Sequence, residues 1–94
     1  MIKVVAKGTY FDGKAEEAIE LYKELVSETR REDGCISYSL FRDVKNASIL
    51  TMIEEWESKE ALDAHMKTEH FTRIVPIISK LRIDSELNIY ELVM

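Results

Sequence analysis

The two histidines of this chain, His65 and His70, have the side chains best suited to moving a proton near neutral pH. With an ordinary pKa of about 6.5, an imidazole can take a proton from a phenol or a quinol. The electron-rich anion that remains can then be attacked by molecular oxygen. Each histidine also has a structural interpretation. His65 can tie a helix to a carboxylate or a strand, and His70 can orient the helical segment that it begins.

The spacing of the two histidines predicts a break in the helical pattern around them. Ser58 is an N-cap candidate for a helix over residues 59–66, and Thr68 is a second cap candidate. On one straight helix the two imidazoles would point about 140° apart, whereas a break before Thr68 allows them to converge. We expect both histidines to be catalytic residues, with His65 as the base and His70 helping to shape the pocket. Because no third ligand follows at a recognised spacing, the pair does not predict a metal site.

Other side chains suit the binding of an aromatic ligand. Tyr38 can donate a hydrogen bond to a quinone oxygen, and Trp56 can stack on a ring. Phe71 can line a pocket, and Arg73 can stabilise an oxyanion. Each has an alternative, because the three aromatic residues suit a core equally well and the arginine suits a solvated surface.

Composition limits the classes of protein to which this chain can belong. The 94 residues make a single domain, residues 1–94, of which 46% are apolar and 33% charged. A net charge of −5 argues against nucleic acid or an anionic membrane as a partner. The lone Cys35 excludes an internal disulfide. With no apolar run near about 18 residues and a strand-like start in place of a signal peptide, we expect a soluble cytoplasmic protein.

Hydrophobic periodicity predicts the secondary structure. Strands are predicted over residues 2–10, 35–43, 49–56 and 87–94, where apolar residues alternate with polar ones or occupy both faces. In the second strand, Ile36, Tyr38 and Leu40 are predicted to share one face. An amphipathic pattern predicts a helix over residues 15–29, which Asp12 is expected to cap and Gly34 to stop. A second helical region, broken once, extends to residue 81, and Pro76 is expected to bend or restart it.

The resulting order, β-α-β-β-α-β, is typical of a ferredoxin-like α+β sandwich. In that architecture the helices cover one face of a four-stranded antiparallel sheet. The strands of this chain carry apolar residues on both faces, so something must cover the second face. A second copy of the sheet is the simplest candidate, and we therefore expect a homodimer packed sheet to sheet.

Three groups of residues stand out in order along the chain: Glu32-x-Gly34-Cys35-x-x-Tyr38, then Glu55-Trp56-x-Ser58-x-x-Ala61-Leu62-x-x-His65, then Thr68-x-His70-Phe71. Together they resemble the antibiotic biosynthesis monooxygenase family, most closely its quinol monooxygenase branch. The resemblance spans nearly the whole chain. It implies a ferredoxin-like fold, a dimeric α+β barrel and a pocket between sheet and helices in each subunit. It also implies oxygenation of reduced quinones or aromatic polyketides without metal, flavin or haem.

Haem-degrading members of the same family differ from this chain at three positions. They carry an asparagine on the first strand, where this sequence has Lys7. They carry a tryptophan on the helix, where the matching position holds His65. Their downstream histidine ligand would fall in residues 73–75, which read Arg-Ile-Val. The sequence therefore does not predict haem degradation.

We expect a cofactor-independent monooxygenase that oxidises a small quinol, polyphenol or related aromatic with molecular oxygen. On this hypothesis His65→Ala lowers turnover sharply while the protein stays folded. The alternative is a dimeric protein that binds or isomerises a small metabolite in the same pocket without oxygenase activity. A third interpretation is a structural dimer with no chemistry in the pocket, which predicts that no small aromatic molecule raises the melting temperature.

Overall fold

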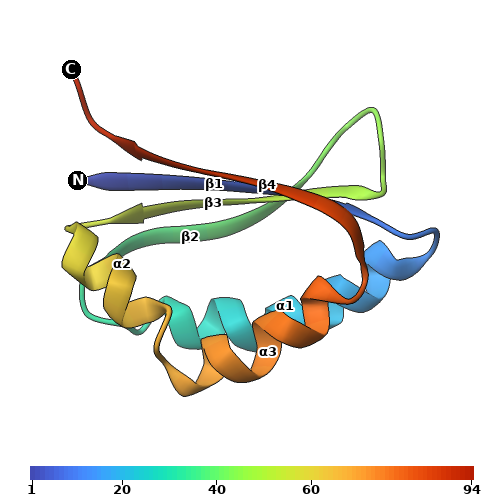
Figure 1. Ribbon diagram of the computed structural model, residues 1–94, viewed down its shortest axis with the longest axis horizontal. Coiled ribbons are helices and arrows are strands. Elements are labelled where there is room, and N and C mark those ends of the chain that lie inside the picture. Colours follow the sequence, from blue (N-terminus) through green and yellow to red (C-terminus); the bar gives the residue numbers. More distant parts are fainter.

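All the helices of the protein lie on one face of a single antiparallel sheet (Figure 1). The computed structural model describes residues 1–94. The elements are β1 (Ile2–Tyr10), α1 (Lys14–Thr29), β2 (Cys35–Arg42), β3 (Ile49–Trp56), α2 (Lys59–His65), α3 (Glu69–Ser79) and β4 (Arg82–Glu91). The strand order is β2-β3-β1-β4. This is the predicted ferredoxin-like arrangement, with the second helical region divided into α2 and α3.

The core lies between the helices and the helix-facing side of β1 and β3. The register pairs Val4 with Glu54 and Ala6 with Met52, so the even-numbered residues of both strands point toward the helices. Because side chains alternate along a strand, the odd-numbered residues point to the opposite, open face. The large buried apolar side chains of the core are Tyr10, Leu25, Tyr38, Leu50, Met52, Trp56, Leu62, Ile74 and Ile78. Fully burying a large apolar side chain stabilises a fold by about 1.5–3 kcal/mol.

A β-bulge in β2 corrects the predicted alternation of that strand. Cys35 pairs with Trp56 and Ser37 pairs with Glu55, so Ile36 is an extra residue without a partner in the register. After the bulge, Tyr38 faces the helices and is buried, whereas Ile36 is about half exposed. The sequence analysis assumed strict alternation and placed Ile36 on the same face as Tyr38. That prediction was wrong, because an inserted residue reverses the alternation of side chains on one side of the bulge.

The structure also corrects three predicted boundaries. Helix α1 is preceded by Gly13 in a left-handed conformation, with no side-chain cap from Asp12. Helix α3 runs through Pro76 without ending, because Ile74 and Ile78 anchor it to the core on both sides of the proline. Strand β4 begins at Arg82 and not at residue 87, and it ends at Glu91. Its first residues are polar on the open face, which hid the strand from a search for apolar runs.

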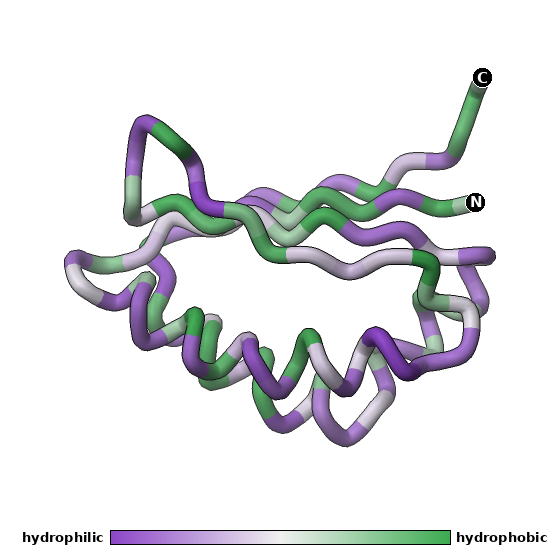
Figure 2. Tube along the Cα trace, turned by 180° about the vertical axis from the view of Figure 1, so that it is seen from behind, coloured by the Kyte–Doolittle hydropathy of each residue, from purple (hydrophilic) through white to green (hydrophobic).

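The open face of the sheet is more polar than the sequence analysis suggested. Val5 and Ile53 pair at its centre, but Lys3 and Glu55 beside them form an ion pair of 3.6 Å. Exposed apolar residues gather instead on β4 and on the tail that follows it. Figure 2 shows this hydrophobic tail pointing away from the helices. None of the helices has the length and apolar character that a membrane-spanning helix needs.

Candidate active site

Two side-chain caps begin α2 and α3, and the second of them, Thr68, lies at the break between the two helices. Ser58 Oγ accepts a hydrogen bond of 3.1 Å from the backbone N–H of Ala61, and Thr68 Oγ1 accepts one of 3.3 Å from that of Phe71. Thr68 Oγ1 also donates to the backbone carbonyl of His65, at 2.7 Å. Both caps confirm the sequence prediction. Ser58 begins α2 at Lys59, and Thr68 closes that helix at His65 and begins α3 at Glu69.

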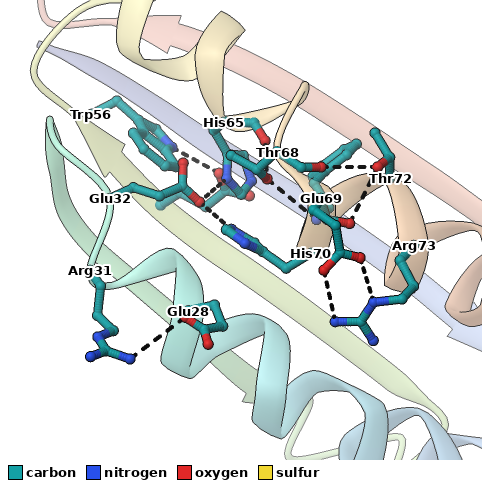
Figure 3. Close-up of polar contacts among 12 residues, drawn as sticks. Glu28, Arg31, Glu32, Trp56, His65, Thr68, Glu69, His70, Thr72 and Arg73 are labelled. Atoms are coloured by element: carbon teal, nitrogen blue, oxygen red, sulfur yellow. Dashed lines mark hydrogen bonds and ion pairs between the residues drawn. The ribbon is translucent and has the colours of Figure 1, made fainter.

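The two histidines on either side of this break converge on one carboxylate, as Figure 3 shows. His65 Nδ1 lies 2.9 Å from Glu32 Oε2, and His70 Nε2 lies 2.6 Å from the same oxygen. The convergence that the break allowed is therefore present. Glu32 belongs to the loop between α1 and β2, and sequence reasoning gave it no role. Hydrophobic periodicity gives no link between Glu32 and the two histidines, which lie 33 and 38 positions further along the chain.

Glu32, His65 and His70 are also residue types that ligate metals, and one ligand atom from each lies within 4.8 Å of the others. The distances decide how they interact here. Two ligands of one tetrahedral zinc ion, each bound at about 2.0–2.1 Å, lie about 3.3 Å apart. Both nitrogens are closer than that to Glu32 Oε2, at 2.9 and 2.6 Å. The arrangement is therefore that of two hydrogen bonds to a shared carboxylate oxygen.

His65 is packed among aromatic rings and is 1% exposed. Its ring centroid lies 4.6 Å from that of Trp56, 5.0 Å from Phe71 and 5.4 Å from Tyr38. Burial lowers the pKa of His65 below its ordinary value, and the hydrogen bond to Glu32 partly opposes this. The imidazole is therefore neutral near pH 7 and able to accept a proton.

Glu54 is a buried carboxyl group that the sequence analysis did not select. It is 6% exposed, and Trp56 Nε1 donates a hydrogen bond of 2.9 Å to its Oε1. Burial raises the pKa of Glu54 to about 7, although the hydrogen bond from Trp56 opposes the shift. A signal for it was present, because Glu54 shares its face of β3 with Leu50, Met52 and Trp56. A carboxylate in such a row is a candidate functional group.

Two cavities lie between the helix-facing side of the sheet and the helices. The larger has a volume of about 170 Å³, and its apolar wall includes Leu25, Tyr38, Met52, Phe71 and Val75. The smaller has a volume of about 60 Å³ and is lined by residues that include Val4, Leu62, His65, Met66 and Ile89. Glu54, Phe71 and Leu87 line both, so the cavities are adjacent. An apolar cavity of about 150 Å³ can hold benzene, so the larger one has room for a single ring.

The structure brings some of the predicted site residues to these cavities and leaves others outside. Tyr38 and Phe71 line the larger cavity, and His65 and Phe71 line the smaller. Trp56 is completely buried behind them and contacts the site through Glu54. His70 lines neither cavity, although it shares Glu32 with His65.

Arg73 lies on the outer surface of α3, away from both cavities. Its Nε donates to Glu69 at 2.6 Å, and its guanidinium also pairs with Glu24 of α1. These exposed ion pairs link the two helices. The geometry does not place the Arg73 guanidinium where an oxyanion in the cavity would form.

The residues around the two cavities combine proton acceptors with a proton donor. The Glu54 carboxylate and the neutral imidazole of His65 can each take a proton. Burial raises the pKa of Tyr38 far above its ordinary value, so its hydroxyl stays protonated and can donate a hydrogen bond. The other walls are largely apolar. Such a site can bind a small aromatic hydroxyl compound and remove a proton from it.

Comparison with proteins of known sequence identifies related chains. A 62-residue segment, 66% of this chain, is 37% identical to the uncharacterized protein sll1783 of Synechocystis and spans 42% of that protein. A segment of the same length is 34% identical to the Bacillus subtilis protein named "Putative monooxygenase YcnE", of which it spans 65%. The matched segment thus covers less than two thirds of each of these relatives.

Solved structures resemble the chain over almost its full length. A conserved protein of Methanosarcina mazei is 41% identical, with a TM-score of 0.93, over 96% of this chain and 90% of the other. A crystal structure described as an antibiotic biosynthesis monooxygenase is 39% identical, with a TM-score of 0.94, over 100% of both chains. The model of the family with the same description matches residues 1–76. The protein therefore belongs to the antibiotic biosynthesis monooxygenase family.

Proposed function

We propose that the protein is a cofactor-independent monooxygenase that oxidises a small, single-ring quinol or polyphenol with molecular oxygen. The observation that carries this proposal is the Glu54 carboxyl. It lies on the wall of an apolar cavity with room for one ring, and its pKa is raised to about 7. A base with a pKa near the working pH combines a large deprotonated fraction with a strong drive to take a proton. Membership of the family supports a monooxygenase-like activity in general terms.

The reaction begins with transfer of a proton from a substrate hydroxyl to Glu54 or to His65. The O–H bond of the substrate breaks, and its electron pair enters the ring. Oxygen then adds to an electron-rich ring carbon that carries a hydrogen, and the resulting peroxide takes the proton back from the base to give a hydroperoxide. Loss of water from the hydroperoxide leaves a carbonyl at that carbon. One oxygen atom stays in the product and the other leaves as water, so the substrate itself supplies all the electrons.

The remaining residues of the site have supporting roles in this proposal. The Tyr38 hydroxyl donates a hydrogen bond to the oxygen on which negative charge develops. Phe71, Met52 and Leu25 hold the ring by apolar contact and keep water away from the hydroperoxide. Because a quinol anion reacts with oxygen directly, the residues need only bind it, orient it and move protons.

The same groups favour one alternative function. Two proton acceptors on adjacent cavities, Glu54 and His65, could move a proton between two positions of a small metabolite without consuming oxygen. The protein would then be an isomerase, or a binding protein, with the same cavity. Oxygen consumption separates this alternative from the first proposal.

We also propose that the protein is a homodimer. The open face of the sheet is uncovered, with Val5 and Ile53 at its centre. On the same face, Phe41 of β2 and Tyr90 of β4 pair with Thr51 and Lys3 and are about half exposed. A second copy packed on this face would bury these side chains together.

The test is oxygen uptake by the purified, metal-stripped protein with a panel of single-ring quinols, catechols and larger polycyclic phenols. We expect uptake above the protein-free rate for single-ring compounds and much less for tricyclic ones, which exceed a cavity of about 170 Å³. Two variants accompany the wild type. Glu54→Gln removes the carboxylate and keeps the acceptor for Trp56, and His65→Asn keeps a donor toward Glu32 while removing the second ring nitrogen.

Each result decides between the proposals. Oxygen uptake that falls on the order of 10²–10⁴-fold in Glu54→Gln supports the oxygenase with Glu54 as its base. Uptake that is unchanged in both variants overturns the assignment of the bases. Conversion of a panel compound without oxygen uptake favours the isomerase.

A further inference from the structure

The Glu32 carboxylate is positioned to control the protonation of His65. It lies in the loop that follows α1, and both histidines at the α2–α3 break contact its Oε2 (Figure 3). The side chain of Glu32 is 13% exposed and that of His65 is 2% exposed. Hydrogen bonds at such a site are weakened little by water, so this one should hold the His65 ring in one state.

Charge and hydrogen-bond chemistry determine which state that is. An ionised carboxylate can only accept hydrogen bonds, so the nitrogen that faces it must carry the proton. For His65 that nitrogen is Nδ1, at 2.9 Å. A neutral imidazole has one N–H, and therefore Nε2 carries the lone pair. The ring lines the smaller cavity, next to Glu54 and Phe71.

We propose that Glu32 is a positioning residue that fixes His65 as the Nδ1–H tautomer and so leaves Nε2 as the proton acceptor for a ligand in the cavity. This inference rests on the proposed function for its role in turnover. The tautomer itself does not depend on that function. Glu32 does not line either cavity and acts through His65.

His70 completes the arrangement from the other side of the break. Its Nε2 lies 2.6 Å from Glu32 Oε2 and donates to it in either the neutral Nε2–H form or the charged form. This second hydrogen bond holds the carboxylate in place. His70 lines neither cavity, so its part in the site is exerted through Glu32.

Glu32 also stabilises the product of proton transfer. When Nε2 takes the proton of a substrate hydroxyl, the O–H bond breaks, an N–H bond forms and the ring becomes a cation. The Glu32 carboxylate then lies 2.9 Å from a charged imidazolium, which it stabilises. The same proton is returned to the peroxide oxygen that forms when oxygen adds to the ring, so the hydroperoxide is complete and His65 is neutral again; the hydrogen of that ring carbon and the outer hydroxide then leave together as water.

The test is nuclear magnetic resonance of ¹⁵N-labelled protein, with long-range correlations between the imidazole nitrogens and ring protons. The chain has only two histidines, so only four ring nitrogens appear, and His70→Ala assigns them. We expect His65 in the wild type at neutral pH to show a protonated Nδ1 and an unprotonated Nε2. In Glu32→Ala we expect a mixture of tautomers. The control is Glu28→Ala, whose carboxylate pairs with Arg31 on the surface; it should match the wild type.

Two outcomes overturn the proposal. One is a wild-type His65 with the proton on Nε2, and the other is an unchanged Nδ1–H tautomer in folded Glu32→Ala. The wild-type spectrum decides the first question even if the variant fails to fold. The NMR measurement needs no substrate, so its result is independent of the oxygen-uptake test. The proposed tautomer can be confirmed when no panel compound is oxidised, and it can be contradicted when one is. Where a compound is oxidised, Glu32→Ala should lower kcat with little change in KM, because only part of the His65 population then presents an unprotonated Nε2 and the imidazolium loses its carboxylate partner.

Discussion

Trp56 Nε1 donates a hydrogen bond of 2.9 Å to Glu54 Oε1, and both side chains project from β3 toward the helices. This contact holds a carboxyl group at the junction of two cavities. Burial and the hydrogen bond act in opposite directions on its pKa, and burial is the larger effect. Glu54 is therefore the group in this protein whose charge should change close to pH 7.

The first prediction concerns activity as a function of pH. Because the ionised form of Glu54 accepts the substrate proton, kcat/KM should rise with pH and level off above a midpoint near 7. The measurement is the initial rate of oxygen uptake between pH 5 and 9, corrected for autoxidation. A profile that is flat across that range would remove Glu54 from the mechanism.

The second prediction is that Glu54→Gln increases stability at neutral pH while it lowers activity. The pKa of Glu54 is raised from 4.5 to about 7, so its contribution to stability is fully present below pH 4.5 and is lost as the pH rises through 7. A shift of this size corresponds to about 3 kcal/mol. The uncharged glutamine avoids that loss and should be more stable than the wild type by about 1–3 kcal/mol at pH 8.

Urea denaturation at pH 5 and pH 8 measures this difference. Glu55→Gln is the control, because Glu55 lies on the open face of the same strand and pairs with Lys3. It should change the free energy of unfolding by less than about 1 kcal/mol at either pH. If Glu54→Gln is less stable than the wild type at pH 8, the carboxyl is better solvated than its burial indicates.

The third prediction uses the single tryptophan as a reporter. Since Trp56 Nε1 bonds directly to Glu54, ionisation of the carboxyl should alter the emission of the indole, with a midpoint near pH 7. His65 stacks on the same ring at 4.6 Å, and its protonation should give a second change at lower pH, because burial lowers its pKa. Fluorescence from pH 4 to 9 is the measurement. Glu54→Gln should abolish the change near pH 7 and retain the other.

The fourth prediction distinguishes two glycines with positive φ. Gly34, at φ +84°, lies beside α2, and a Cβ at this position would sit 2.6 Å from Ala61 Cβ. Gly13, at φ +75°, has open space around the same position. Gly13→Ala should cost about 1–2 kcal/mol of unfolding free energy, from backbone strain alone. Gly34→Ala should cost about 1–3 kcal/mol more, because α2 must also move.

Thermal and urea denaturation of the two alanine variants test this pair. Because Gly34 follows Glu32 closely in the same loop, Gly34→Ala should also disturb the His65 tautomer, which Gly13→Ala should leave unchanged. Equal costs for the two substitutions would show that the loop can move away from Ala61.

The fifth prediction concerns the dimer. Light scattering at micromolar concentration should give about 22 kDa, twice the chain mass of 10.9 kDa. Phe41 projects from β2 on the open face and is 52% exposed, and Ile77 on α3 is 46% exposed. Phe41→Asp should weaken the dimer, whereas Ile77→Asp, matched in exposure on the helical side, should not. A wild-type mass of about 11 kDa would contradict sheet-to-sheet packing.

Local patterns in the sequence were sufficient to predict most of the elements and the break in the second helical region. Ser58 and Thr68 act as caps on residues only three positions ahead, so short-range chemistry placed them correctly. Alternation put Met52 and Trp56 on one face of their strand, and the structure shows that this face meets the helices. The same rules failed where one residue changed the local geometry. The bulge at Ile36 is the clearest case.

Tertiary structure alone decided the chemistry of the candidate site. His65 was recognisable as a titratable residue, but its partner Glu32 comes from a loop far away in the sequence. Glu54 was visible as an acidic residue in an apolar row, yet its raised pKa depends on how completely α3 and β4 remove water from it. Caps and alternation depend on neighbours along the chain and can be read from the sequence. Desolvation and long-range hydrogen bonds depend on segments that only folding brings together.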